Sequence, residues 1–169
     1  LFYTGNAGSG MIQGFEWENT LNFSSNLNMD ASLGYLTTWV NKFTYFAAEG
    51  VEAIGGDREA AMSPKMTGSV GFNFKNNSGI FGLVQMSFKD EYYFSDSHNQ
   101  KSKPYTLLNM NIGKSFGKTM VKLWIRNAMD ERYTTRGFYF GLIPPDYPDQ
   151  LWKSYGDPRQ IGVTIDYTF

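Results

Sequence analysis

Cysteine is absent from this sequence of 169 residues, which excludes disulfide bonds and thiolate metal sites within it. Its one histidine, His98, can bind a metal only if other parts of the protein supply the remaining ligands, and no catalytic triad can be assigned around it. No apolar run approaches the roughly 18 residues of a membrane-spanning helix. A formal net charge of −1 gives no electrostatic reason to expect nucleic acid as a partner. We therefore expect no cofactor, no metal site and no enzymatic activity.

Aromatic residues, by contrast, are abundant. The chain has 14 Phe, 11 Tyr and 4 Trp, yet its mean hydropathy is only −0.39, because Asn, Ser, Thr and Gly alternate with the apolar residues. The alternation is unbroken from Ile161 to Phe169. Successive side chains of a strand point to opposite faces, so this strand is apolar on one face and polar on the other. A transmembrane β-barrel strand, with lipid outside and a wet lumen inside, meets both requirements.

Six earlier segments show the same alternation. They cover residues 15–23, 29–39, 66–74, 80–88, 105–116 and 119–127. The connections between segments are either short polar turns or long loops that carry Gly, Pro and charge. The short turns are residues 24–26, 76–79 and 117–118, and the long loops are residues 46–65, 94–104 and 131–157. Short turns on one side and long loops on the other are typical of outer-membrane barrels, whose short turns lie in the periplasm.

Outward-facing aromatic residues gather at the short-turn ends of these segments, as in the interfacial girdle of a membrane barrel. They are Phe23, Phe74, Phe116, Tyr167 and Phe169. The sequence therefore predicts an all-β fold of about seven antiparallel transmembrane β-barrel strands. A soluble β-sandwich or lipocalin-like binder would explain neither the girdle nor the uncovered terminal strand.

Three segments resemble the C-terminal part of the barrel of TonB-dependent outer-membrane receptors. The first is Gly-Phe-Glu-Trp-Glu at residues 14–18, preceded by Asn-Ala-Gly at residues 6–8. The second is Asn-Ala-Met-Asp at residues 127–130, followed by Tyr133, although the family pattern has Leu-Phe in place of Ala-Met. The third is Gly-Asp-Pro-Arg at residues 156–159, which leads into the last strand.

This resemblance implies a nutrient importer of the bacterial outer membrane, with a 22-stranded barrel closed by a plug. Residues 1–169 would form roughly the last third of that barrel, with residues 1–3 as the tail of an eighth strand. Open sheet edges cannot be satisfied in lipid, so we expect the plug and the earlier strands to lie outside this chain. The implied partners are outer-membrane lipid and lipopolysaccharide, the plug and remaining strands, a TonB-type energising complex that engages the plug, and the barrel-assembly machinery. The substrate stays open among iron-siderophores, haem, cobalamin and oligosaccharides.

Charged side chains on the lumen face are expected to contact the plug. They are Glu16 and Glu18 on one strand, and Lys122 and Arg126 with Trp124 on another. The two glutamates stand roughly 7 Å apart by strand rise, a spacing that a glycosidase pair could also use. The basic stripe could alternatively contact an anionic ligand. Several apolar residues on this face would need a folded plug to pack against; they are Phe81, Leu83, Leu107 and Trp124.

The loop at residues 131–157 is the expected place of substrate contact, because exposed aromatic rings offer stacking surfaces to sugars, catecholates and porphyrins. The candidate residues are Tyr133, Arg136, Tyr139, Tyr147 and Trp152. The alternative is that these side chains pack the loop on the barrel rim or lie in lipopolysaccharide. His98, in another loop, is expected to be exposed.

The chain ends on Tyr167 and Phe169, which we interpret as a signal for the barrel-assembly machinery. Strand addition is a natural mode of recognition for such a terminus. Two other functions were weighed: a small structural or adhesin barrel of the outer membrane, and an outer-membrane enzyme. The enzyme would need a Ser-His pair, which the lone His98 does not supply.

Overall fold

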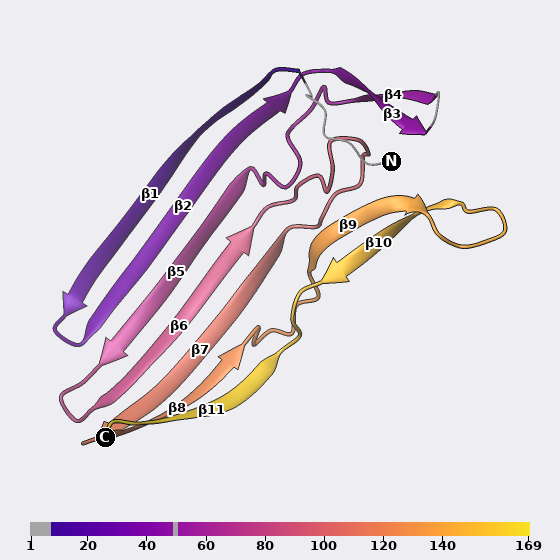
Figure 1. The fold of residues 1–169 in the computed structure, drawn as a ribbon. Coiled ribbons are helices and arrows are strands. Elements are labelled where there is room, and N and C mark those ends of the chain that lie inside the picture. The colour runs from indigo at the N-terminus through magenta and orange to yellow at the C-terminus, as the bar shows by residue number, and fades with distance from the viewer. Residues whose placement is uncertain (1–7, 49–50) are drawn as a thin grey trace.

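The computed structural model describes residues 8–48 and 51–169 and contains strands but no helix in those ranges. The segments at residues 1–3 and 6–7 used above lie outside the described residues. No helix of the described part is long and apolar enough to cross a membrane. Seven strands form one antiparallel sheet in which each strand pairs with the next (Figure 1). In sheet order these are β1 (Gly10–Ser24), β2 (Leu27–Val40), β5 (Met66–Lys75), β6 (Ile80–Lys89), β7 (Tyr105–Phe116), β8 (Thr119–Arg126) and β11 (Gln160–Tyr167).

The seven predicted strands and their three short turns are confirmed. The register is also continuous, because one row of directly opposed residues crosses all seven strands and is apolar throughout. From β1 to β11 this row is Leu21, Met29, Phe72, Val84, Met110, Ile125 and Ile161. A slip of one residue at any strand would turn that strand's apolar side chains to the polar face. The unbroken row therefore shows that every strand presents the same kind of face to the same side.

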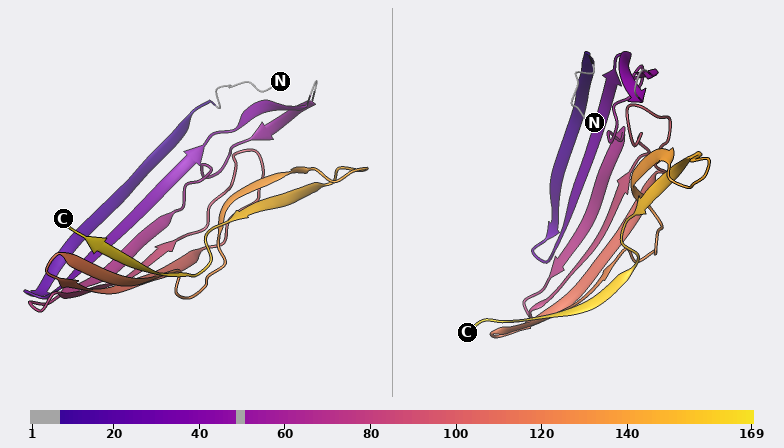
Figure 2. Two further views of the ribbon diagram at one scale, coloured as in Figure 1. Left: turned by 60° about the horizontal axis from the view of Figure 1, so that its bottom comes forward. Right: turned by 45° about the vertical axis from the view of Figure 1, so that its right-hand side comes forward.

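The two faces differ in exposure as well as in polarity. In β6 the apolar Val84, Met86 and Phe88 are exposed, whereas Gln85 and Ser87 on the opposite face are half-buried. The sheet is twisted and curved, and the β9–β10 hairpin leans away from its plane (Figure 2). The polar face is thus the more crowded, concave one, as the inner wall of a barrel must be. Residues Phe116 and Tyr167 share one row through Thr119, which places two girdle aromatics at the same level.

Bulky side chains on the polar face find partners within the sheet itself. Phe81 lies opposite Gly113, and a Cβ atom on that glycine would be only 2.3 Å from the ring. Trp124 lies opposite Gly162 in the same way, where a Cβ atom would be 2.2 Å from the indole. Aromatic rings covering cross-strand glycines are a known device for stabilising sheets. These two side chains therefore have packing partners within the sheet as well as the plug expected from the sequence.

The long loops contain two β-hairpins that the sequence analysis did not predict. One pairs β3 (Phe43–Ala48) with β4 (Val51–Gly55), and the other pairs β9 (Thr134–Gly141) with β10 (Asp149–Tyr155). In β9 three aromatic residues follow one another at positions 138–140, so the period-two pattern of a half-buried strand is absent. Both hairpins lie at the same end of the sheet, opposite the short turns (Figure 1).

Candidate functional site in the loop cluster

Three connections meet at the long-loop end of the sheet and form what we call the loop cluster: residues 41–65, 90–104 and 127–159. The segment 90–104, here named the central loop, lies between the other two. It contains Tyr92 and Phe94, which are only 5% and 8% exposed. No other large apolar side chain of the described residues is buried to this degree. The tightest packing in the described part of the chain is therefore in its loops.

The central loop holds β9 through two buried aromatic side chains. The Tyr92 hydroxyl donates to the backbone carbonyls of Thr134 and Thr135, at 3.3 and 3.2 Å. The Phe94 ring covers Gly137, where a Cβ atom would stand 2.3 Å from the ring. Within the central loop, the Tyr92 N–H donates to the Ser102 hydroxyl at 3.0 Å, and the Tyr92 carbonyl accepts from the Ser102 N–H at 2.9 Å, which holds the backbone of Tyr92 in place. The base of the β9–β10 hairpin is thus attached to the central loop.

The central loop is joined to the first loop by polar contacts. Asp96 accepts a hydrogen bond from the backbone of Ala61 at 2.7 Å. Arg58 donates to the Ser95 carbonyl at 3.0 Å and to the Asn99 side chain, and its guanidinium lies 4.5 Å from the centre of the Tyr93 ring. These bonds make the three loops one connected structure, which a ligand or partner would meet as a unit.

His98 is half-buried, so the expectation that it is exposed was wrong. Its ring lies 5.8 Å from that of Tyr139 on β9, and its Nδ1 accepts a hydrogen bond from the backbone of Gln100. Burial, followed by the nearby Arg58 guanidinium, lowers the pKa of His98 below its ordinary value. The neutral imidazole is therefore the form that fits between the central loop and the hairpin.

We expect the contact between the central loop and β9 to weaken as the pH falls below about 6.5, the ordinary pKa of histidine. His98 binds a proton more readily when the central loop is undocked than when it is docked, because docking lowers its pKa. Protonation therefore favours undocking. The stabilisation is complete above that pH and is lost as the pH falls towards the lowered pKa. Hydrogen exchange of residues 90–104 in the full-length receptor, compared between about pH 7.5 and about pH 5.5, tests this. An unchanged pH dependence in a His98→Gln variant would show that another group is responsible.

The structure does not bring the five candidate substrate-contact residues together. Arg136 and Trp152 share one face of the β9–β10 hairpin, because their cross-strand partners are Ser154 and Phe138. Tyr139 points to the other face, towards His98. Tyr147 is exposed in the turn between the two strands. The exposed hairpin face around Arg136, with Phe138 and Phe140, is the one that the central loop leaves open.

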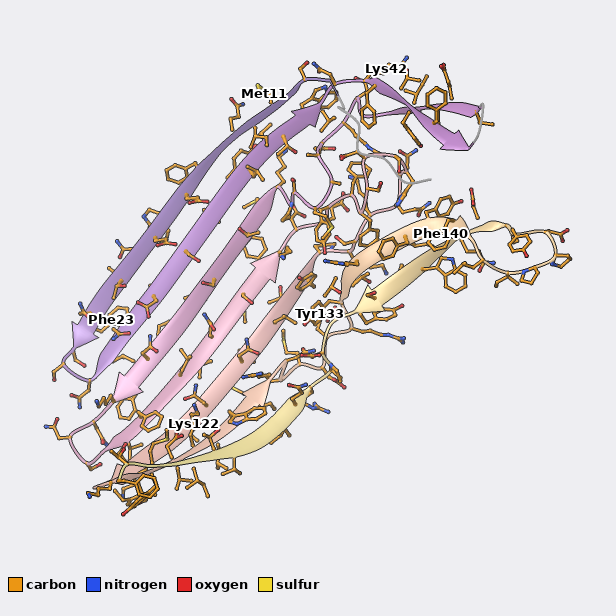
Figure 3. The ribbon with its side chains drawn as sticks, in the orientation of Figure 1. Met11, Phe23, Lys42, Lys122, Tyr133 and Phe140 are labelled. Atoms are coloured by element: carbon orange, nitrogen blue, oxygen red, sulfur yellow. The ribbon has the colours of Figure 1, made fainter. Side chains whose placement is uncertain are left out.

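Tyr133, the fifth candidate, belongs to the base of the hairpin, whereas Phe140 lies near its far end (Figure 3). Its ring centre is 4.6 Å from that of Tyr105, and its other contact is Gly156, where a Cβ atom would come within 2.0 Å of the ring. Tyr133 therefore packs the hairpin against the barrel rim.

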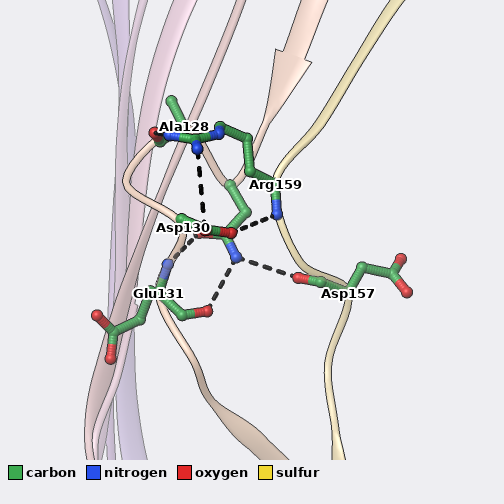
Figure 4. Close-up of polar contacts among 6 residues, drawn as sticks. Ala128, Asp130, Glu131, Asp157 and Arg159 are labelled. Atoms are coloured by element: carbon green, nitrogen blue, oxygen red, sulfur yellow. Dashed lines mark hydrogen bonds and ion pairs between the residues drawn. The ribbon is translucent and has the colours of Figure 1, made fainter.

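Two of the segments that carried the family resemblance meet at the rim (Figure 4). Asn127, only 4% exposed, donates from Nδ2 to the carbonyls of Glu131 and Asp157, at 2.9 and 3.1 Å. Its Oδ1 accepts from the backbone of Glu131 at 2.9 Å. The Asp130 carboxylate accepts from the backbone of Arg159 at 2.9 Å. These residues, here named the rim clamp, join the end of β8 to the start of β11.

The predicted lumen-facing residues lie on the polar face, as their cross-strand partners show. Glu18 is opposite Ser32, and Lys122 is opposite Thr164. Trp124 donates from Nε1 to the Thr164 hydroxyl at 3.2 Å, and the Arg126 guanidinium lies 5.1 Å from the indole centre. No group of three His, Cys, Asp or Glu side chains in residues 8–48 and 51–169 could hold a metal ion.

Comparison with known proteins gives the following similarities. The model of the TonB dependent receptor-like β-barrel family matches residues 1–128. The ferric yersiniabactin uptake receptor FyuA of Yersinia pestis superposes with a TM-score of 0.78 at 15% identity, over 97% of this chain and 24% of that one. The siderophore receptor PiuA of Acinetobacter baumannii gives 0.74 at 14% identity, over 94% and 22%. The ferric-catecholate import receptor Fiu of E. coli gives 0.67 at 13% identity, over 95% and 21%.

At these identities the structural likeness establishes the fold, and this chain spans about a quarter or less of each solved receptor. The family match covers well over half of the chain and includes six of the seven strands of the sheet. The fold, the sidedness of the loops and the family match agree with one another. The chain belongs to the TonB-dependent receptor β-barrel family, whose members are proteins of the Gram-negative outer membrane.

Proposed function

We propose that residues 1–169 form the C-terminal portion of the barrel of a TonB-dependent receptor that imports a scarce nutrient and catalyses no reaction. The observation that carries the proposal is the apolar row across all seven strands, with a polar concave face behind it. Such a sheet suits the wall of a 22-stranded barrel with a plugged lumen. The plug and the remaining strands would come from the rest of the receptor, and the energising complex would act through the plug.

The substrate that we propose is an iron-siderophore complex. This choice is supported by the three solved structures named above, each described as a siderophore or ferric-siderophore receptor. The test is uptake of radiolabelled iron by cells that depend on the full-length receptor, supplied in turn with a ferric catecholate, ferric yersiniabactin, haem iron and labelled cobalamin. We expect uptake of a siderophore-bound iron and its loss when the energising complex is deleted. Uptake of haem iron or cobalamin alone would show that the proposed substrate is wrong and would identify the correct one. Uptake that does not depend on the energising complex would refute the transport mechanism.

Among the candidate ligand contacts, Arg136 and Tyr147 are the sharpest to test, because both are exposed and neither side chain holds the hairpin in place. Replacing either with alanine is expected to weaken binding of the ferric siderophore about tenfold, the effect of a mid-strength contact. The matched control is Lys153→Ala, which removes a side chain from the opposite face of the same hairpin. Equal dissociation constants for all three variants and the wild type, measured by titration, would remove Arg136 and Tyr147 from the binding site.

Glu16, Glu18 and Trp124 are proposed as contacts of the plug. The two carboxylates stand on one face of β1, and no ion pair involves them in the described part of the chain. A carboxylate in a filled lumen requires a donor or cation opposite it. The plug would supply such groups, and Trp124 would offer it a ring already fixed by Gly162 and Thr164.

Tyr167 and Phe169 are proposed as the signal for barrel assembly. Their rings meet at 5.2 Å, and Phe169 is fully exposed. Deleting Phe169 is expected to lower the amount of receptor in the outer membrane several-fold while the molecules that do insert keep their ligand affinity. The reason is that Phe169 makes no buried contact in the sheet that its loss could disturb. Heat-modifiable folded receptor, quantified in membranes for deleted and intact forms, checks this; equal yields would contradict it.

A further inference from the structure

The polar face of the sheet falls into two regions of different character. Over β1, β2 and β5 its side chains bond to one another. Asp30 accepts from Thr20 at 2.7 Å and from Asn73 at 2.6 Å, and the Ser32 and Ser69 hydroxyls are 2.9 Å apart. The carboxylate of Asp30 thus already has donors from both neighbouring strands. The hydrogen-bonded group around Asp30 therefore needs no partner outside the sheet, unlike Glu16 and Glu18 further along β1.

Over β5 to β8 the face is different, because it carries cations without counter-charges. Lys75 and Lys122 lie on one cross-strand row, through Phe81 and Gly113, and Arg126 stands further along β8. Neither ion pair found in the described residues, Lys101–Glu91 or Arg159–Asp130, involves any of these three. The carboxylate of Asp166, on the neighbouring strand β11, is opposite Met120 and forms no ion pair with Lys122.

These cations border two adjoining hollows of about 760 and 390 Å³. Lys75 and Lys122 line the larger, and Lys122 and Arg126 line the smaller; Leu83 and Asn111 are common to both. Neither lining includes a carboxylate. The combined surface, which we name the basic hollow, is therefore complementary to an occupant that carries negative charge.

The remaining lining indicates what kind of anion fits. Phe81, Leu83 and Met120 add apolar surface beside the cations, along a stretch of wall that reaches from β2 to β8. The cations and the apolar side chains are spread over several neighbouring strands of the wall. A folded polypeptide surface combines apolar contact with charged groups over a broad area of this kind.

We propose that the basic hollow docks an acidic and partly apolar face of the polypeptide domain that fills the lumen. The inference rests on the proposed function, since it requires a plugged barrel. What it adds is that the face of the plug opposite β5 to β8 is negatively charged. Lys75, Lys122 and Arg126 each receive a carboxylate, while Phe81 and Leu83 exclude water around the pairs. The region over β1 and β2 presents the carboxylates of Glu16 and Glu18 in place of cations, so the charge fixes how the domain is rotated within the barrel.

The test uses the full-length receptor with Lys75→Glu, Lys122→Glu and Arg126→Glu combined. The matched control is Lys42→Glu, Lys103→Glu and Lys118→Glu, which changes the net charge equally at exposed positions outside the hollow. Hydrogen exchange of the lumen-filling domain is measured in detergent, and ion conductance in planar bilayers. We expect exchange at least about tenfold faster in the first variant only, because losing even one charge-assisted bond changes an opening equilibrium by that factor. Its conductance should rise as well.

The outcomes separate the two hypotheses. An open, conducting wild-type receptor without a protected lumen domain would refute the proposed function itself. A closed wild type with equal protection in both variants would overturn only the acidic docking face. Reduced ligand uptake with unchanged protection and conductance would also overturn it and would assign the basic hollow to an anionic solute. If the charge reversals prevent insertion, the same measurements are made on a variant with glutamine at the three positions. Hydrogen exchange of the lumen-filling domain and conductance are again expected to rise.

Discussion

Replacing Asn127 with alanine is expected to lower the free energy of unfolding of the segment between β8 and β11 by about 3–5 kcal/mol. The three hydrogen bonds from the buried Asn127 side chain to the peptide groups of Glu131 and Asp157 are lost. The backbone of Asn127 has a φ of 48°, a left-handed conformation that asparagine adopts more readily than alanine. In limited proteolysis of the full-length receptor, cleavage within residues 127–159 should accelerate about a hundredfold or more.

Two companion variants show where this loss arises. Asn127→Gly removes the same hydrogen bonds but accepts the left-handed backbone, so its difference from Asn127→Ala measures the conformational part. Asn77→Ala makes the same chemical change in an exposed short turn and should alter stability by no more than about 0.5 kcal/mol. Proteolysis of Asn127→Ala at the wild-type rate would mean that the rim clamp does not hold the segment between β8 and β11 in place.

Replacing Gly137 with alanine is expected to displace the central loop, at a cost of about 1–3 kcal/mol, the range for overpacking a filled site. A Cβ atom there would stand 2.3 to 2.7 Å from three atoms of the Phe94 ring, far inside contact distance. The ring cannot move aside freely, because it is buried between the central loop and β9. Hydrogen exchange of residues 90–104 in the full-length receptor should therefore rise, by about tenfold for each 1.4 kcal/mol lost.

The matched control is Gly71→Ala on the polar face of β5, where the nearest atom to an added Cβ is Leu83 Cδ1 at 3.5 Å, an ordinary contact. This variant should keep the wild-type exchange of the central loop and the wild-type heat-modifiability of the barrel. If Gly137→Ala leaves exchange unchanged, Phe94 has another position available, and the central loop is attached to β9 by Tyr92 alone.

The sheet was predictable from sequence because lipid and water impose opposite demands on alternate residues. Val84, Met86 and Phe88 alternate with polar residues and so indicate the lipid face of β6. The two-residue turn at Gly117 indicates that β7 and β8 pair with each other. The apolar row needs only these local patterns and the short turns. Asn127 and Arg159 of the rim clamp belong to segments that carried the family resemblance, but their contact was not predicted from the sequence.

The loop cluster was less predictable, because its structure depends on contacts between distant segments. Nothing near Phe94 in sequence indicates that its ring will cover Gly137, and β9 lacks the alternation that marks a half-buried strand. Tyr133 illustrates the same limit, because the sequence does not show that its ring packs against Tyr105 and Gly156. His98 was assigned to solvent because the sequence does not show the hairpin that covers it.

The rim clamp also bears on how such receptors acquire new specificities. Asn127 and Asp130 are hydrogen-bonded to Asp157 and Arg159. The segment between these two pairs, which carries the β9–β10 hairpin, therefore begins and ends at one fixed point. Lengthening a chain whose ends are already joined costs little, and surface segments of this kind tolerate insertion and exchange. The register of β8 with β11 would not change. The hairpin can thus be exchanged as a cassette, by natural recombination or by grafting, while the wall that carries it is inherited intact.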